Sequence, residues 1–179
     1  DGEYKLMGLA PFGQPRYAAA LLDHVVHIGP NGELHLDQRW FAYRVGKHMA
    51  HPRLADLLDG PPLAAGSPVG IREADLAAST QVVLEQAVLA IVERAARTTG
   101  ERFACLAGGV ALNCVANGRL LAEGPFEDLW IQPAAGDDGG ALGAALWTAH
   151  QILDRPRAPA GVGGDRMRGA FLGPTFDGD

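Results

Sequence analysis

The sequence has few cysteines, no excess of basic residues and no long hydrophobic run, and each scarcity excludes a class of protein. Two cysteines in 179 residues, Cys105 and Cys114, are too few for a disulfide-stapled secreted scaffold. Fifteen basic residues against 21 acidic ones give a net charge of −6, too acidic for a surface that coats nucleic acid. No apolar stretch approaches the roughly 20 residues that span a bilayer. We therefore expect a cytoplasmic protein that binds neither nucleic acid nor membrane, with both cysteines packed in its core.

What is present is enough apolar material for one core. Hydrophobic residues make up 47% of the chain and charged residues 20%, which fits one domain or one lobe of a larger protein. The chain begins at Asp1 without a methionine, and its last residues, to Asp179, have no helix or strand pattern. We expect it to be a fragment of a longer polypeptide.

The first seventy residues carry one strong local signal within irregular sequence. Three glycines and two prolines within 1–15 predict a structured loop. Residues 16–24 favour a short helix. Alternating segments flank the pair Asn31-Gly32, which is typical of a β-hairpin. The stretch 39–70 is predicted to be irregular, with one short helix at residues 54–58 (LADLL).

The rest of the chain alternates between strand and helix patterns. Apolar residues recur on one face of a long helix at 73–99, and Gly100 stands where helices commonly end. Short apolar strands and glycine-punctuated helical stretches follow, which predicts a parallel α/β unit. The expected elements are a strand at 103–107, a helical stretch at 109–124, a strand at 128–133 and a helix at 141–154.

Ligands of parallel α/β sheets bind beyond the carboxyl ends of the strands, where the first of two glycine turns stands. Gly108-Gly109 places two residues without Cβ before a helix, a setting that favours phosphate. The alternative is a tight turn that simply needs glycine. Asn113, one helical turn further on, either contacts a nucleotide or is a solvated helix residue. Lys5 is a candidate anion contact, with a merely exposed lysine as the alternative.

The second turn, Gly136-Asp137-Asp138-Gly139-Gly140, follows the next strand. Two adjacent carboxylates flanked by glycines suit the coordination of a metal–phosphate complex. Either aspartate is equally a candidate N-cap for the helix that follows. One carboxylate can cap while the other coordinates, so both interpretations stay open here.

The histidines form two pairs with HxxH spacing, which places two imidazoles on one face of a helix. These pairs are His24 with His27 and His48 with His51. Zinc sites need further ligands at suitable spacing, and the sequence offers none. His27 and His35 flank the predicted hairpin, so we expect them to lie on strand faces rather than in a metal site.

Three segments together resemble one family. GEYKLMGLAPFG (2–13), LAGGVALNCVANGRL (106–120) and PAAGDDGGALGAAL (133–146) resemble motifs of the NodU/CmcH O-carbamoyltransferases, in the family's order. The resemblance implies an α/β fold of the ASKHA (actin-like ATPase, ribonuclease-H-like) type, with a parallel or mixed sheet flanked by helices. It implies that 1–155 is the C-terminal lobe of that domain, 156–169 a linker, and 170–179 the start of a truncated YrdC-like domain.

The resemblance also implies a reaction. Such enzymes use ATP and carbamoyl phosphate to form a carbamoyl-adenylate, and they transfer the carbamoyl group to a hydroxyl of an antibiotic, another natural product or a nodulation factor. A divalent metal is expected, Fe²⁺ first and Mg²⁺ or Mn²⁺ as alternatives, with Asp137 as its ligand and Asp138 as runner-up. No catalytic residue is assigned. The implied nucleotide-binding residues are Gly108, Gly109, Val110, Asn113, Gly136 and Asp138.

The sequence departs from the family pattern at the histidines. The family's metal-binding HxxxH is absent and only HxxH occurs, so no histidine is carried over as a ligand. We expect that motif and the first phosphate-binding loop upstream, and the YrdC-like domain downstream, so the chain alone should be inactive. Two other functions remain: an ASKHA phosphotransferase resembling sugar kinases, and a non-catalytic nucleotide-binding lobe.

Overall fold

The computed structural model describes residues 3–44, 46, 48–157 and 173–176. The chain divides into two compact units: unit 1 comprises 1–104 with 113–129, and unit 2 comprises 105–112 with 130–179. Most of the predicted linker and of the predicted start of a YrdC-like domain lies outside the described residues.

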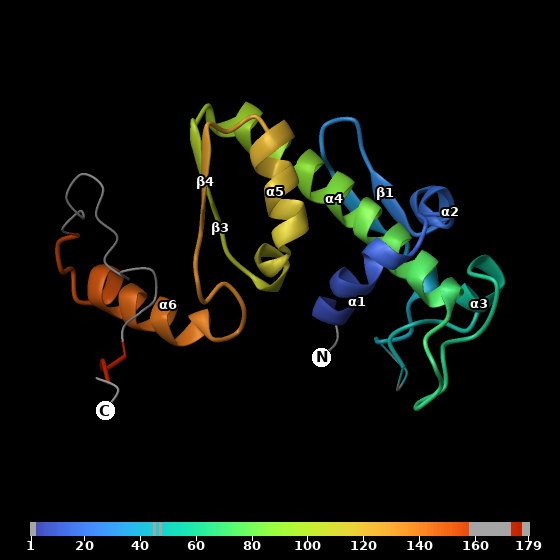
Figure 1. Cartoon of the computed structure of the whole chain (residues 1–179). Coiled ribbons are helices and arrows are strands. Elements are labelled where there is room, and N and C mark those ends of the chain that lie inside the picture. The colour runs from blue at the N-terminus through green and yellow to red at the C-terminus, as the bar shows by residue number, and fades with distance from the viewer. Residues whose placement is uncertain (1–2, 45, 47, 158–172, 177–179) are drawn as a thin grey trace. The chain divides into compact units, whose positions relative to one another are not determined.

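A long helix, α4 (Ile71–Thr99), forms the core of unit 1 (Figure 1). It begins where the side chain of Glu73 accepts a hydrogen bond from Gly70 N (3.0 Å). It ends at Gly100, whose φ of 68° is left-handed, so the predicted end is confirmed. The buried face carries mostly small residues, which let other segments approach closely: Ala74, Asp75, Ala77, Ala78, Ser79, Gln81, Val83, Ala87 and Val92.

By length and composition α4 is also a candidate membrane span. An 18-residue window reaches a mean hydropathy of 1.4, with 44% of it buried inside the molecule. The lack of an uninterrupted apolar run in the sequence was therefore not enough to exclude a helix that is long and apolar enough to span a membrane. The buried positions of α4 nevertheless include Asp75, Ser79 and Gln81, each hydrogen-bonded to a segment far away in the sequence. We interpret α4 as a core helix.

Residues 3–12 are helical, so the prediction of a loop over 1–15 was wrong for this part of the range. Helix α1 (Glu3–Leu9) continues into a 3₁₀ turn at Ala10–Phe12, and both pack against α4. The glycines and prolines suggested a loop, but Gly8 is tolerated within the short helix, and Pro11 stands at the first turn of the 3₁₀ segment. Helix α2 (Ala18–His24) follows, close to its predicted range.

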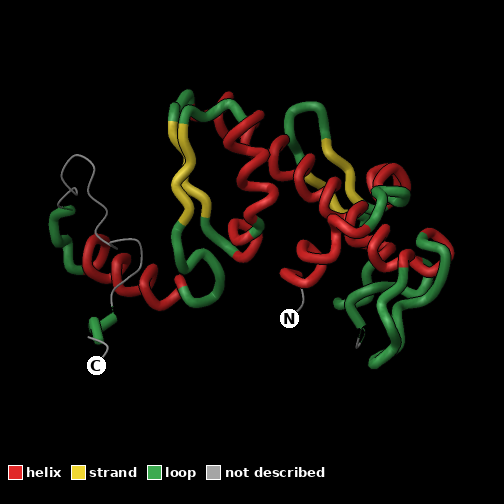
Figure 2. The backbone as a smooth tube through the Cα atoms, in the orientation of Figure 1, coloured by secondary structure: helices red, strands yellow, loops and turns green. Residues whose placement is uncertain are grey.

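The predicted hairpin is confirmed. Strands β1 (Val26–Ile28) and β2 (Leu34–Leu36) pair antiparallel, with His27 opposite His35, and Figure 2 shows them as one of two short strand pairs. Gly32 has a φ of 80° and lies so close to α4 that a Cβ would overlap the carbonyl oxygen of Ala90. Only glycine satisfies both conditions. The short helix expected in the irregular stretch is α3 (Leu54–Leu57).

The second strand pair confirms the α/β class. Strands β3 (Phe103–Leu106) and β4 (Asp128–Ile131) form a two-stranded sheet. Glu127 N donates to Arg102 O and Gln132 N to Leu106 O, so hydrogen-bond partners advance together and the strands run parallel. Helices α5 (Cys114–Glu123) and α6 (Gly139–Trp147) follow the strands, and α6 continues into a π-helical turn at Thr148–Ile152.

Both cysteines are exposed, so their predicted packing in the core was wrong. Cys105 lies on the outward-facing register of β3, alongside an exposed Phe103, and Cys114 is the first residue of α5. The apolar neighbours of Cys105 in the sequence suggested a buried strand. Within the described residues, however, β3 pairs with one strand alone, which leaves Cys105 exposed.

Candidate functional site

Unit 2 brings the two glycine turns together at the carboxyl ends of β3 and β4. Gly108 N donates a 2.7 Å hydrogen bond to Ala135 O, which joins the turn after β3 to the residue before Gly136. A Cβ on Gly136 would lie 3.3 Å from a side-chain methyl of Leu112, in the 3₁₀ turn that follows Gly108. The two segments singled out in the sequence are thus neighbours, at the edge where parallel sheets bind ligands.

In the first turn, the backbone conformation requires glycine at position 108, and the space beside both Gly108 and Gly109 is open. Gly108 has a φ of 106°, a conformation that other residues rarely adopt. A Cβ on Gly108 or Gly109 would meet no atom within 4 Å, and Val110 is 53% exposed. The backbone conformation explains Gly108 without a ligand, whereas nothing in the described packing demands glycine at 109.

The second turn leaves two carboxylates available. Gly139 N donates to Gly136 O and Gly140 N to Asp137 O, both at 3.1 Å, and these bonds wind the chain into α6. Asp138 occupies the N-cap position of α6, yet its side chain makes no capping hydrogen bond. Asp137 and Asp138 are both exposed, and neither carboxylate has a hydrogen-bond or ion-pair partner within the described part of the chain. Glycine is required at 139, because a Cβ there would overlap the carbonyl oxygen of Ala134.

The two aspartates suit a metal ion that is bound jointly with phosphate and water, and not an ion that is enclosed by protein ligands alone. No cluster of three or more His, Cys, Asp or Glu side chains that could hold a metal occurs among the described residues, so no all-protein cage is formed. Neither HxxH pair belongs to such a cluster, and His51 Nδ1 accepts a hydrogen bond from Arg53 N (3.2 Å). Asp137 and Asp138 fit an ion held by one or two carboxylates, with phosphate and water completing its shell.

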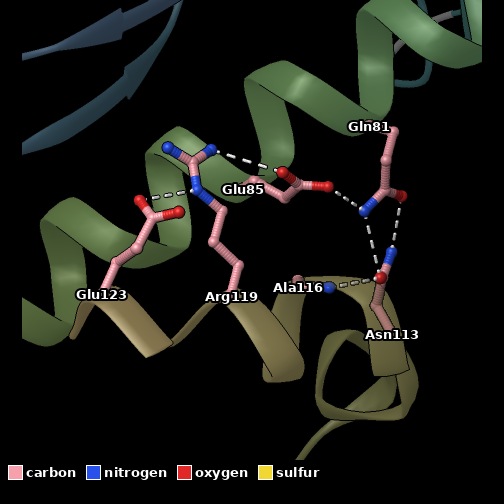
Figure 3. A network of polar contacts seen from close by, with 6 residues as sticks. All are labelled: Gln81, Glu85, Asn113, Ala116, Arg119 and Glu123. Atoms are coloured by element: carbon pink, nitrogen blue, oxygen red, sulfur yellow. Dashed lines mark hydrogen bonds and ion pairs between the residues drawn. The ribbon is translucent and has the colours of Figure 1, made fainter. Parts of the chain in front are cut away.

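Asn113 lies in unit 1, and its side chain is engaged at both ends (Figure 3). Its Oδ1 accepts hydrogen bonds from Ala116 N (3.0 Å) and Gln81 Nε2 (3.1 Å), and its Nδ2 donates to Gln81 Oε1 (2.9 Å). Asn113 therefore caps α5 and joins it to α4, a role that neither interpretation from the sequence included. The signal that could have revealed this role is the preference of asparagine for N-caps. It was overlooked because the helix was predicted to begin at 109, which placed Asn113 inside the helix.

An arginine continues this network along the two helices. Arg119 Nη1 lies 3.3 Å from Glu85 Oε2 on α4, and Arg119 Nε lies 3.0 Å from Glu123 Oε2 on α5. Gln81 Nε2 also donates to Glu85 Oε1 (2.8 Å). The two carboxylates hold the pKa of Arg119 above its usual value, chiefly through the hydrogen bond with Glu123. Sequence reasoning missed Gln81 and Glu85, because a helical pattern does not show which polar residues face another helix.

A buried carboxylate holds the N-terminal motif against α4. Asp75 is 1% exposed, and its Oδ1 accepts a hydrogen bond from Gln14 N (2.7 Å) while its Oδ2 lies 3.3 Å from Arg16 Nη1. Two residues on, Tyr17 N donates to the buried Ser79 Oγ (2.9 Å). Lys5 lies on α1, is exposed, and has its Nζ 5.8 Å from the Tyr4 ring centroid. Its role as an anion contact stays a prediction.

Comparison with known proteins decides the family. A family model described as "Carbamoyltransferase N-terminus" matches residues 1–146. This chain belongs to the NodU/CmcH carbamoyltransferase family. It is 49% identical over 98% of its length to an uncharacterized protein of Synechocystis, 39% over 97% to nodulation protein NolO of Bradyrhizobium diazoefficiens, and 35% over 99% to nodulation protein NolNO of Sinorhizobium fredii. It spans 28%, 29% and 24% of those proteins, respectively.

The three motifs of this chain thus have different local roles. The first (2–13) forms a helix and a 3₁₀ turn on α4, the second (106–120) spans the Gly108 turn and the capped start of α5, and the third (133–146) forms the two-aspartate turn and α6. Residues 106–112 of the second motif and the third motif together build the candidate site in unit 2. Placement in an ASKHA fold, the domain boundaries and the ligand roles of the site residues stay predictions.

Proposed function

We propose that this carbamoyltransferase chain is part of an ATP-dependent O-carbamoyltransferase and contributes to its nucleotide site. The enzyme would form carbamoyl-adenylate from carbamoyl phosphate, ATP and water, with release of inorganic phosphate and pyrophosphate, and would then carbamoylate a hydroxyl of a small molecule. The observation that supports this most is the hydrogen bond from Gly108 N to Ala135 O, which holds two glycine turns together at the carboxyl ends of parallel strands. Family membership supports carbamoyl transfer in general.

The proposed transfer step needs a bound adenylate and a nearby acceptor. The acceptor hydroxyl oxygen attacks the carbamoyl carbon, the bond from that carbon to the adenylate oxygen breaks, and AMP leaves with the electron pair while the hydroxyl loses its proton. Gly108 and Gly109 would let phosphate approach the backbone closely, since no side chain intervenes. Asp137, or Asp138 as the alternative ligand, would hold a divalent ion, which neutralises charge on the phosphate when bound.

The completed enzyme would need more polypeptide than this chain. Helix α6 is almost wholly apolar, and none of its residues is buried by the described part of the chain; Trp147 is 64% exposed. A helix that is apolar all round is normally covered by protein. We propose that an upstream lobe and a YrdC-like domain complete the enzyme, and that the chain alone does not turn over carbamoyl phosphate. The nodulation proteins among its relatives make a natural-product hydroxyl the proposed acceptor.

The test is calorimetric titration of ATP into the full-length protein, with and without Mn²⁺, and into its Asp137→Asn and Asp138→Asn variants. If the aspartates hold the ion, Mn²⁺ strengthens ATP binding to the wild type and loses this effect in at least one variant. Asp154→Asn is the matched control. Asp154 lies in unit 2, is exposed, and has a φ of 49° that asparagine adopts readily. A Mn²⁺ effect that survives in both variants contradicts the proposed metal ligands.

Product analysis separates carbamoylation from phosphotransfer. Transfer through an adenylate releases pyrophosphate and AMP from ATP, whereas a kinase releases ADP. AMP formation that depends on both carbamoyl phosphate and an acceptor supports the proposal. Stoichiometric ADP with a phosphorylated acceptor would overturn it.

A further inference from the structure

The β1–β2 hairpin of unit 1 presents two histidines to each other across the strands. His27 and His35 are direct partners in the antiparallel register. Their ring centroids lie 6.3 Å apart and the ring planes differ by 15°. Both side chains are exposed, and neither ring has a hydrogen-bond partner within the described part of the chain. Within the described part of the chain, the four imidazole nitrogens are thus free of hydrogen bonds.

The hairpin holds the two histidines on a well-anchored backbone. Gly29 N donates to Glu33 O (2.7 Å) and Asp37 N to Val25 O (3.0 Å), so hydrogen bonds flank the histidine pair on both sides. The turn is fastened to α4 by Arg97 Nη2, which donates to Asn31 O (2.9 Å). The spacing of the two side chains is therefore set by the folded backbone, and only the side-chain torsions need to change when a ligand binds.

We propose that His27 and His35 form a binding site for a divalent transition-metal ion that prefers imidazole ligands, such as Zn²⁺ or Cu²⁺. Neutral imidazole nitrogens bind these ions at about 2.0–2.1 Å, and side-chain rotation of both rings towards each other would bring one nitrogen of each to a shared ion. Water would complete the shell. The site is separate from the two-aspartate turn and does not depend on the proposed function.

The experiment titrates ZnCl₂ into the full-length protein by calorimetry. One Zn²⁺-binding event of the wild type is expected to lose at least about tenfold in association constant in His27→Gln and in His35→Gln, because a metal site loses this much even when a supporting group is removed; binding at the proposed two-aspartate turn should not change. His24→Gln is the matched control. His24 shares the HxxH spacing with His27 but contacts the Trp40 ring instead of His35, so the same affinity as the wild type is expected.

Three results would overturn the proposal: no Zn²⁺ binding by the wild type, the same Zn²⁺ stoichiometry and association constants in the wild type, His27→Gln and His35→Gln, or a loss of affinity in His24→Gln with no loss in His35→Gln. Circular dichroism verifies that each variant is folded, which is expected because the replaced side chains are exposed. Electron paramagnetic resonance of the Cu²⁺ complex gives a second measurement. Coupling to two nitrogens is expected in the wild type and to one nitrogen in each single variant; one nitrogen in the wild type contradicts a shared ion.

Discussion

Two glycines of the N-terminal motif should respond to alanine in opposite directions. Gly13 has an ordinary extended conformation (φ −118°), yet a Cβ on it would overlap the carbonyl of Ala74 and lie 2.5 Å from Asp75 N. Gly8 lies within α1, and a Cβ there would meet nothing within 4 Å. Gly13→Ala should therefore destabilise the protein, whereas Gly8→Ala should stabilise it.

The magnitudes follow from what each change affects. Alanine at 13 would push the segment off α4 and strain or break the hydrogen bonds from Gln14 N to Asp75 and from Tyr17 N to Ser79. A bond to a carboxylate contributes about 1.5–3 kcal/mol and one to a hydroxyl about 0.5–1.5 kcal/mol, so the expected loss is about 2–4 kcal/mol. Alanine at 8 should add about 0.5–1 kcal/mol, the difference in helix propensity from glycine.

Urea denaturation of the two variants and the wild type, followed by circular dichroism, measures both free energies of unfolding. The midpoint should fall for Gly13→Ala and rise for Gly8→Ala, with similar slopes. If Gly13→Ala lies within about 0.5 kcal/mol of the wild type, an ordinary surface effect, the close approach to Ala74 is not what determines glycine at this position.

Two further predictions concern polar pairs. In a double-mutant cycle, Gln81→Ala and Asn113→Ala should show a coupling energy of about 1–2 kcal/mol by urea denaturation, since their side chains share two hydrogen bonds; additive effects would contradict the pairing. The pKa of Asp37, about 2 in the folded protein, should rise towards the usual value of about 3.9 in Arg39→Gln, as followed by NMR titration of the carboxyl. Because the pKa of Asp37 is lower in the folded than in the unfolded protein, the Asp37–Arg39 contribution to stability is present above about pH 4 and is lost as the pH falls towards 2. An unchanged Asp37 pKa in Arg39→Gln would contradict the assignment of the shift to Arg39.

The secondary structure was predictable where local sequence and tertiary packing agree. Helix α4 has both a long apolar periodicity and a terminal glycine, and the hairpin has an Asn-Gly turn between alternating segments. The positions of the two glycine turns followed from the rule that ligand-binding turns gather at the carboxyl ends of parallel strands. These features depend on neighbours in the sequence or on general topology.

The features that were missed depend on partners far away in the sequence. Helix α1, which contains Gly8, and the 3₁₀ turn that contains Pro11 form because both pack on α4, which no local pattern reveals. The amide pair of Gln81 and Asn113 joins residues 32 positions apart. The exposure of Cys105 depends on how many strands flank β3, and apolar composition alone does not give that number.

The hydrogen bonds that Gln14 N and Tyr17 N donate to Asp75 and Ser79 have a consequence for the order of folding. Gln14 bonds a residue 61 positions later, so during synthesis the N-terminal motif leaves the ribosome well before the surface on which it docks exists. Because α4 supplies that surface with a buried carboxylate and a buried hydroxyl, the motif can reach its final place only after α4 is helical. Closing so long a loop slows folding more than it lowers stability. We therefore expect residues 3–17 to gain protection from hydrogen exchange late in folding, after α4 is already protected.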